Sequence, residues 1–161
     1  MNAEGRTFKG CLYFGLMLTA DGPKVIEYNC RFGDPETQVV LPLLESDLLT
    51  IMMATSEGRL SEVPVKFSDK SACCVIIASK GYPVKYESGC PLALPADGED
   101  GVIYVAGAKR TEAGLVSAGV TATADTLREA VDAAYAKAAK VRFDNGFYRK
   151  DIGARALAAK E

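Results

Sequence analysis

The sequence predicts an α+β fold, and three observations support this class. A strand–turn–strand pattern stands near the N-terminus, further apolar strands follow in the second half, and one strongly amphipathic helix lies near the C-terminus. With 161 residues, the chain is long enough for one ordinary domain or for two small lobes. Hydrophobic residues make up 48% and charged residues 25%, which is typical of a chain that folds around a core.

An N-terminal β-hairpin is predicted from two apolar runs, at 11–18 and 24–29, with turn residues at 19–23 between them. Side chains alternate between the two faces along a strand. One face of the second strand is therefore expected to carry Val25, Glu27 and Asn29.

Two helices are expected after the hairpin, a short apolar helix at 36–44 and a longer one at 47–57. Ser46 is a favourable N-cap for the longer helix. Gly58 stands where a left-handed residue commonly follows the last turn of a helix. These elements are expected to complete a first lobe.

A boundary between two lobes is predicted in the polar, proline-containing stretch at 58–70. The hydrophobic periodicity changes after this stretch, which supports the division. The predicted domains are therefore 1–62, with the hairpin and its helices, and 63–161, a small β-rich lobe with a long helix.

The second lobe is expected to contain strands at 71–79 and 102–109 and a further strand or hairpin at 115–123. A long helix at 126–142 is predicted because apolar residues recur there at i, i+3 and i+4. A short helix at about 151–159 is expected to follow. The apolar face of the long helix is expected to hold Leu127, Ala130, Val131, Ala134, Tyr135 and Ala138.

The composition disfavours several classes of protein. Nineteen basic and 21 acidic residues give a net charge of -2 without long runs of one sign, so no nucleic-acid partner is expected. No apolar run approaches the roughly 20 residues of a membrane-spanning helix, and no secretion signal is visible, so a cytoplasmic protein without a membrane partner is expected. The chain has no histidine and its five cysteines lack CxxC spacing, which disfavours zinc sites and histidine triads.

The densest functional signal is the alternation of Glu27, Asn29 and Arg31 along the second predicted strand. A carboxylate and an amide oxygen at i and i+2 can converge on a hard cation such as Mg²⁺, or Mn²⁺ in its place. The guanidinium of Arg31 can bind a phosphoryl oxygen. The same alternation also fits the solvated face of an antiparallel sheet, so spacing alone leaves both interpretations open.

The string KVIEYNCRFGDPETQVVLPLLESDLL at 24–49 resembles the signature of the glycinamide ribonucleotide synthetases, also called phosphoribosylamine–glycine ligases, within the ATP-grasp superfamily. The shorter E-x-N-x-R pattern is similar to the general metal and phosphate site of that superfamily, whereas RFGDPETQ is typical of this one family. Further similar stretches lie at 10–22, 78–83 and 147–157. The resemblance thus covers nearly the whole chain.

The resemblance implies an enzyme of de novo purine biosynthesis that joins phosphoribosylamine to glycine with ATP. The reaction would pass through a glycyl phosphate and release ADP and phosphate. By the same resemblance, Glu27 and Asn29 would hold Mg²⁺ (or Mn²⁺) beside the nucleotide, and Arg31 would contact the transferring phosphoryl oxygens. Asp34, in the Gly-Asp-Pro turn, would help to hold the amine substrate or glycine.

The resemblance also implies that the chain is the C-terminal portion of a longer enzyme, from the end of an ATP-grasp subdomain onward. The N-terminal part of the same enzyme would then be its partner, and the isolated piece is expected to be inactive and prone to self-association through uncovered apolar surface. At 116–121 the family has a longer turn that contains Gly-Gly-Arg-Val-Leu, so either the hairpin of the second lobe is shortened or residues of this turn are missing from the sequence.

Two alternatives remain open at the level of the residues. Another ATP-grasp carboxylate–amine ligase, or a related carboxylase, would keep Glu27, Asn29 and Arg31 but act on a different substrate. A non-catalytic binding or assembly lobe would keep the acidic strand only as a solvated face.

Overall fold

The computed structural model describes residues 1–87, 89–95, 101–106 and 118–159. The chain divides into two compact units. Unit 1 comprises Met1–Thr37 and Leu44–Ser68, and unit 2 comprises Gln38–Leu43 and Asp69–Glu161. Both units combine short helices with antiparallel strands, so the predicted α+β class is confirmed.

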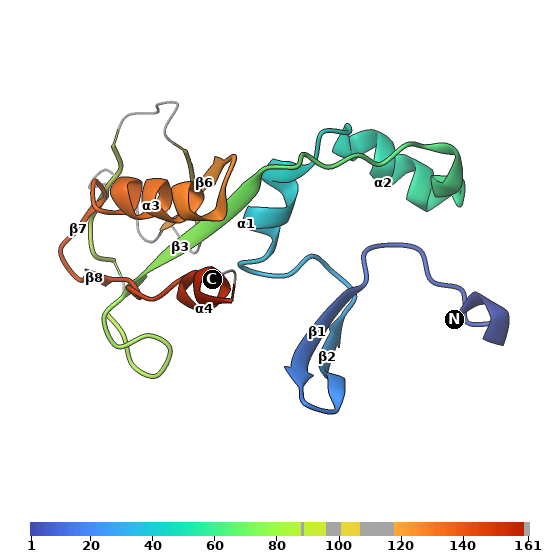
Figure 1. Ribbon diagram of the computed structural model, residues 1–161, viewed down its shortest axis with the longest axis horizontal. Coiled ribbons are helices and arrows are strands. Elements are labelled where there is room, and N and C mark those ends of the chain that lie inside the picture. Colours follow the sequence, from blue (N-terminus) through green and yellow to red (C-terminus); the bar gives the residue numbers. More distant parts are fainter. Residues whose placement is uncertain (88, 96–100, 107–117, 160–161) are drawn as a thin grey trace. The chain divides into compact units, whose positions relative to one another are not determined.

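Unit 1 is built around the predicted hairpin, which is confirmed. Strands β1 (Tyr13–Thr19) and β2 (Gly22–Asn29) pair antiparallel, and the chain reverses through the two residues between them (Figure 1). A short 3₁₀ turn, η1 (Asn2–Glu4), precedes the hairpin. The hairpin places the end of β2 beside the start of β1, where Tyr13 pairs with Asn29.

A β-bulge interrupts the hairpin and corrects one expectation about its faces. Glu27 pairs with Gly15, but Val25 pairs with the next residue of β1, Leu16, so Ile26 is the extra residue. Neighbouring residues of β1 point to opposite faces, and paired residues share a face. Val25 therefore lies on the opposite face from Glu27, contrary to the strict alternation predicted for β2.

The short helix expected at 36–44 is split into two pieces. Helix α1 (Thr37–Val40) is followed directly by the 3₁₀ turn η2 (Leu41–Leu43). Pro42 has no backbone N–H and cannot continue the α-helical hydrogen-bond pattern, which accounts for the change of geometry. Within unit 2, η2 contacts the long strand β3 (Ser71–Ser79).

Helix α2 (Leu48–Glu57) forms as predicted but with a different cap. Asp47, not Ser46, is the N-cap: its side chain accepts a hydrogen bond of 2.7 Å from the backbone N–H of Thr50. The prediction for Ser46 was wrong because tertiary contacts occupy its hydroxyl. That hydroxyl donates to the carbonyl of Pro64 and accepts from the N–H of Lys66. The prediction for Gly58 is confirmed, since its φ of 78° is left-handed.

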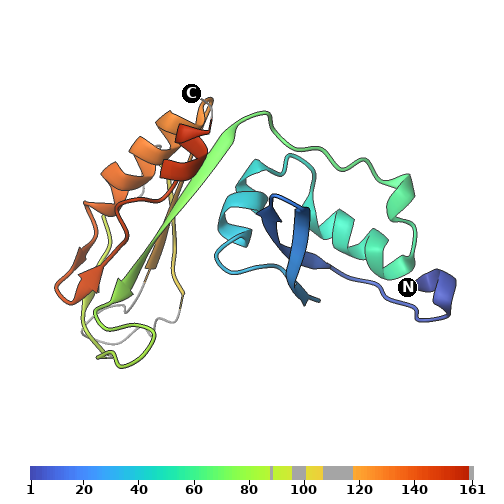
Figure 2. The ribbon, with the colours of Figure 1, turned by 60° about the horizontal axis from the view of Figure 1, so that its bottom comes forward.

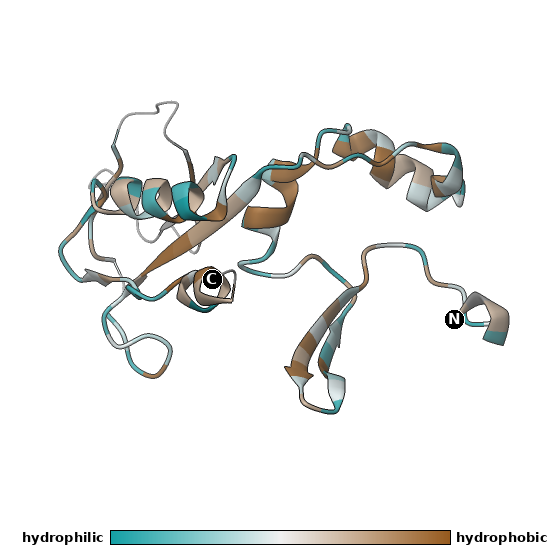
Figure 3. Ribbon diagram, in the orientation of Figure 1, coloured by the Kyte–Doolittle hydropathy of each residue, from teal (hydrophilic) through white to brown (hydrophobic). Residues whose placement is uncertain are grey.

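Unit 2 is a small antiparallel sheet covered on one face by helix α3 (Leu127–Ala138), as Figure 2 shows. Strand β3 is central and hydrophobic along most of its length (Figure 3). The main sheet has the order β5-β6-β3-β8, and a separate pair joins β4 to β7. Their bounds are Leu92–Ala93 (β4), Val102–Tyr104 (β5), Ala118–Ala124 (β6), Arg142–Phe143 (β7) and Gly146–Phe147 (β8).

The core of unit 2 lies between α3 and the sheet. Thr126 and Glu129 form a capping box at the start of α3, which fixes where the predicted helix begins. The predicted apolar face is confirmed at Ala130, Val131, Ala134 and Ala138, all of which are buried. Opposite them, β3 buries Cys73, Val75 and Ile77.

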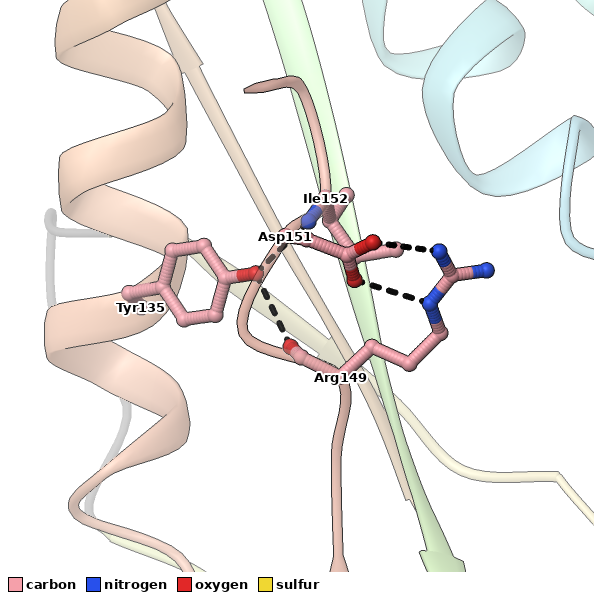
Figure 4. Close-up of polar contacts among 4 residues, drawn as sticks. All are labelled: Tyr135, Arg149, Asp151 and Ile152. Carbon is pink, nitrogen blue, oxygen red and sulfur yellow. Dashed lines mark hydrogen bonds and ion pairs between the residues drawn. The ribbon is translucent and has the colours of Figure 1, made fainter. Parts of the chain in front are cut away.

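The C-terminal helix α4 (Ala154–Ala158) is shorter than predicted and is tied to α3 by one tyrosine. The Tyr135 hydroxyl donates to the carbonyl of Arg149 and accepts from the N–H of Ile152, both at 2.9 Å (Figure 4). Beside it, Arg149 and Asp151 form two parallel hydrogen bonds of 2.9 and 2.6 Å. These contacts fix the chain that leads into α4.

Two predicted segments fall partly outside the described residues. The strand expected at 102–109 is observed only as β5, which ends at Tyr104: residues 105 and 106 are described and lie outside any strand, so the prediction was too long there, and 107–109 lie in an undescribed stretch. The strand expected at 115–123 corresponds to β6, and the start of the shortened turn at 116–121 again lies outside the description. Within the described residues, no helix combines the length and the hydropathy that a membrane crossing requires.

Candidate functional site

The hairpin brings Glu27 and Asn29 together. The Asn29 side-chain nitrogen donates a hydrogen bond of 3.0 Å to the Glu27 carboxylate. The bulge lies before Glu27, so the two residues keep their i, i+2 relation and share one face of β2. A carboxylate and an amide therefore stand side by side on an accessible face at the end of the strand.

Gly15 leaves room for the Glu27 side chain. It pairs directly with Glu27 across the hairpin, and a Cβ atom at this position would lie 3.0 Å from the Glu27 Cγ. That distance is tighter than ordinary van der Waals contact. A side chain on β1 would thus push Glu27 away from its present position, which explains why glycine suits this strand position.

Arg31 and Asp34 lie beyond the strand, in the turn that leads to α1, and both are exposed. One nitrogen of the Arg31 guanidinium donates to the carbonyl of Phe32 at 2.9 Å. This bond uses one of the five guanidinium donors of Arg31. The four residues named by the sequence motif therefore all lie at or just beyond the end of β2.

Two further residues of this region, Tyr13 and Glu36, lie within the stretches that resemble the family, but the sequence assigned no role to either. The Tyr13 hydroxyl donates a hydrogen bond of 2.9 Å to the Glu36 carboxylate. This bond is the main reason that the pKa of Tyr13 lies above its ordinary value, and the negative charges of Glu36 and Glu27 add to the effect. The charge of Arg31 acts in the opposite direction. The two residues are 23 positions apart in the sequence, so their contact cannot be predicted from local spacing.

Gly33 allows Glu36 to turn back toward Tyr13. A Cβ atom at Gly33 would collide with the Glu36 carboxylate, so only glycine permits the observed approach. The Gly33 carbonyl also accepts a hydrogen bond of 3.1 Å from the Thr37 N–H and a second one from the Thr37 hydroxyl. The turn is thus held at both ends, and it fixes where Glu36 lies.

The oxygen donors of Glu27 and Asn29 suit a hard divalent cation. Carboxylate and amide oxygens are typical Mg²⁺ ligands, and proteins often supply only one or two of them beside a nucleotide. The described residues contain no group of three or more His, Cys, Asp or Glu side chains that could hold a metal ion. The donor set therefore fits a metal shared with a phosphate ligand better than a metal enclosed by protein.

A separate pocket of about 320 Å³ lies elsewhere in unit 1. It lies against one side of helix α2, with Cys11, Phe32, Ile51 and Met52 among the lining residues. None of Glu27, Asn29, Arg31 and Asp34 lines it. The candidate site is consequently an open strand end and not this pocket.

Comparison with known families first defines the class of protein. Residues 1–37, which contain the hairpin and the turn with Arg31 and Asp34, match the family model "Phosphoribosylglycinamide synthetase, ATP-grasp (A) domain". Residues 72–155, just over half of the chain, match "Phosphoribosylglycinamide synthetase, C domain". Unit 1 thus carries part of an ATP-grasp domain. The chain belongs to the phosphoribosylglycinamide synthetase family, as the resemblance predicted.

Individual relatives agree with this assignment. The chain is 44% identical over 159 residues to phosphoribosylamine–glycine ligase of Caldanaerobacter subterraneus subsp. tengcongensis, a match that covers 96% of the chain and 38% of the relative. It is 47% identical over 163 residues to the enzyme of that name from Halalkalibacterium halodurans, with 98% and 38% covered. The chain thus spans less than half the length of these curated relatives.

A solved structure confirms the fold. The crystal structure of phosphoribosylamine–glycine ligase from Thermotoga maritima matches with a TM-score of 0.81 at 35% identity. The match covers 94% of this chain and 39% of that one. The order of hairpin, helices and β-rich lobe is therefore that of a region within a longer ligase.

Proposed function

We propose that the chain is part of an ATP-dependent ligase that joins phosphoribosylamine to glycine and releases ADP and phosphate in purine biosynthesis. Its membership of the family and the names of its relatives support this activity. The observation that carries the proposal is the adjacent pair of Glu27 and Asn29, at 3.0 Å, followed by the exposed Arg31. These groups are suited to metal and phosphate.

Glu27 and Asn29 would hold the Mg²⁺ or Mn²⁺ ion through their side-chain oxygens. When bound, the ion would offset the negative charge of the ATP phosphates. Asn29 now turns its amide nitrogen toward Glu27. Rotation of that amide by half a turn exchanges its nitrogen and oxygen, and it would present the oxygen on the same side as the Glu27 carboxylate.

Arg31 would bind the phosphoryl group that passes from ATP to the glycine carboxylate. Its permanent charge and planar fork suit phosphoryl oxygens, and charge stabilisation of this kind is the main contribution a protein makes to phosphoryl transfer. The resulting glycyl phosphate has a good leaving group, so the amine nitrogen of phosphoribosylamine can attack the carbonyl carbon as phosphate departs. The carboxylate of Asp34 would hold the ammonium group of glycine or the amine substrate.

The remainder of the site would come from other parts of the same enzyme. The chain spans only 38% of the length of the first relatives, and the ATP-grasp model matches only residues 1–37. We place the boundary between the ATP-grasp portion and the C-terminal β-rich domain near residue 63. The 161-residue chain alone is expected to bind no ATP productively and to show no ligase activity.

The decisive experiment measures product formation by mass spectrometry in the full-length protein that contains this chain, with ATP, glycine and phosphoribosylamine. Glu27→Ala and Asn29→Ala are each expected to lower kcat/KM by about 100-fold or more, since each removes a group that binds charge in the transition state. Glu57→Gln is the matched control, because Glu57 is an exposed carboxylate of unit 1 that pairs with Arg59.

Full activity in both alanine variants would contradict the site, and their carboxylate and amide would then be a solvated strand face. Absence of the amide product in the unmodified full-length protein would contradict the substrate assignment. A different amide product would instead support another ATP-grasp carboxylate–amine ligase.

A further inference from the structure

The Tyr13 hydroxyl lies among charged groups of the proposed ligase site. The hydroxyl donates a hydrogen bond of 2.9 Å to Glu36, and Tyr13 pairs with Asn29 across the hairpin. Glu27 and Arg31 both act on this hydroxyl electrostatically. A neutral hydroxyl therefore binds the Glu36 carboxylate at the end of the hairpin that carries Asn29.

Glu36 is held in place from two directions. The Tyr13 hydroxyl binds one carboxylate oxygen, while the other oxygen lies against the Cα of Gly33, which has no side chain to displace it. Thr37 adds two hydrogen bonds to the Gly33 carbonyl and so stabilises the turn that positions Glu36. The carboxylate is thus directed toward Tyr13.

Arg31 is a cation near Glu36, because its guanidinium donates to the carbonyl of Phe32 and the Glu36 carboxylate lies against the next residue, Gly33. Within the described residues, its guanidinium has a single hydrogen bond, to the Phe32 carbonyl, and no ion pair. A carboxylate and a guanidinium attract strongly at short range and prefer a bidentate pair. Such a pair would occupy the nitrogens that have to receive a phosphoryl group.

We propose that Tyr13 is a positioning residue: its hydroxyl holds the Glu36 carboxylate on the turn and thereby keeps Arg31 open to phosphoryl oxygens. This inference rests on the proposed function of Arg31. It adds Tyr13 as a residue that acts through another group, and it makes Glu36 the carboxylate that Tyr13 holds away from Arg31. Tyr13 contacts neither ATP nor glycine in this scheme, and Glu36 acts only through its charge when it is released.

The test uses three variants of the full-length protein: Tyr13→Phe, Glu36→Gln and the double variant. Tyr13→Phe removes the hydroxyl and keeps the ring, so Glu36 becomes free to pair with Arg31. We expect kcat/KM to fall about tenfold, with a raised KM for ATP, as follows from the loss of one charged contact to the phosphates. Glu36→Gln alone is expected to stay within about threefold of the parent, because its amide oxygen still accepts from Tyr13 and its charge is gone.

The double variant separates positioning from simple structural support. It lacks the same hydroxyl as Tyr13→Phe, but its neutral amide side chain at position 36 cannot form an ion pair with Arg31, so kcat/KM and the KM for ATP should return to within about threefold of the parent. If the hydrogen bond only stabilises the fold, the double variant will be at least as impaired as Tyr13→Phe. The recovery therefore decides the question even if Tyr13→Phe also lowers the melting temperature.

Tyr28→Phe is the matched control, because Tyr28 lies on the opposite face of the same hairpin with its ring edge-on to Phe14 at 5.1 Å. Parent-like kinetics in Tyr13→Phe, or no recovery in the double variant, would overturn the positioning role. Glu27→Ala, measured in the same series, tests the proposed function separately. If Glu27→Ala keeps full activity, the ligase site itself is wrong and this inference falls with it.

Discussion

Unit 2 encloses a hydrophobic core, whereas unit 1 leaves most of its large apolar side chains in contact with solvent. Among the described residues of unit 2, ten hydrophobic residues form one buried cluster around β3 and α3. Among the described residues of unit 1, Ala54 alone is a buried hydrophobic residue. The two units are similar in having antiparallel strands, so the difference lies in what covers those strands.

The hairpin of unit 1 shows this contrast most clearly. On the face opposite Glu27, the residues are almost all apolar, and Leu18 is 82% exposed. A two-stranded ribbon with an uncovered apolar face is marginal by itself, and such surfaces are normally covered by other protein. Unit 2 is therefore expected to fold independently, whereas the hairpin is expected to need further protein for stability. The exposed members of this face are Phe14, Leu16, Leu18, Val25 and Tyr28.

The largest expected effect is a core truncation in unit 2. Ile77→Ala removes a side chain that is only 3% exposed and should lower the free energy of unfolding of unit 2 by about 3 kcal/mol or more. Leu18→Ala, the matched change in unit 1, should alter the free energy of unfolding of unit 1 by less than about 0.5 kcal/mol in the 161-residue chain. Denaturant titrations in which hydrogen exchange reports on each unit separately would measure both changes in the free energy of unfolding. Similar changes in the two variants would contradict the proposed difference between a buried core in unit 2 and exposed apolar side chains in unit 1.

A glycine comparison is expected to give the next largest difference. Gly153 has φ 81°, and a Cβ atom there would lie 2.7 Å from the Val131 Cγ2. Gly22 has φ 96°, but nothing lies within 4 Å of its added Cβ. Both alanine variants strain the backbone by about 1 kcal/mol, and only Gly153→Ala also disturbs a core. Gly153→Ala should therefore lower the melting temperature of unit 2 by more than Gly22→Ala lowers that of unit 1. Equal shifts would show that the contact with Val131 relaxes freely.

A smaller effect is expected from the tyrosine that ties α4 to α3. Tyr135→Phe removes a hydroxyl with two backbone partners, the Arg149 carbonyl and the Ile152 N–H. Its loss should destabilise unit 2 by about 1 kcal/mol and increase hydrogen exchange mainly in 149–158. Tyr28→Phe in unit 1 should leave both quantities unchanged. Uniform exchange over unit 2 would mean that α4 does not open separately.

The smallest effect is a pH dependence in unit 1. Hydrogen bonds from Thr50 hold the pKa of Asp47 below its ordinary value of 3.8. The stabilisation of α2 by this cap is therefore fully present above the ordinary value and is lost as the pH falls through the lower folded value. Asp47→Asn keeps a capping oxygen but should abolish this dependence. Hydrogen exchange of 48–57 between about pH 2 and 6, with the parent and the variant in parallel, would measure it.

Much of the architecture follows from local sequence, and the departures have tertiary causes. The long helix was predicted because its apolar period is regular, and the capping box of Thr126 and Glu129 confirms its start. Two adjacent residues, Ser46 and Asp47, can both cap α2, and propensity cannot decide between them. The contacts of Ser46 with Pro64 and Lys66, which lie far along the chain, select Asp47.

The candidate site was predictable only in part. Glu27, Asn29 and Arg31 are visible as a motif because they lie on one strand and the turn after it. Their roles stay a prediction. The bulge at Ile26 changes which residues accompany them, and the pairing of Tyr13 with Glu36 depends on how the hairpin and the turn meet. No periodicity or spacing encodes either feature.

The bulge has a consequence for how this hairpin can change during evolution. In a strictly alternating ribbon, adding or removing one residue turns every later side chain to the other face. Ile26 already takes up one unpaired position between the tip and Glu27. The number of residues between the tip and Glu27 therefore does not by itself decide which face Glu27 and Asn29 occupy. Sequences that differ by a single residue near the tip can therefore keep the same polar face, provided that they gain or lose the bulge.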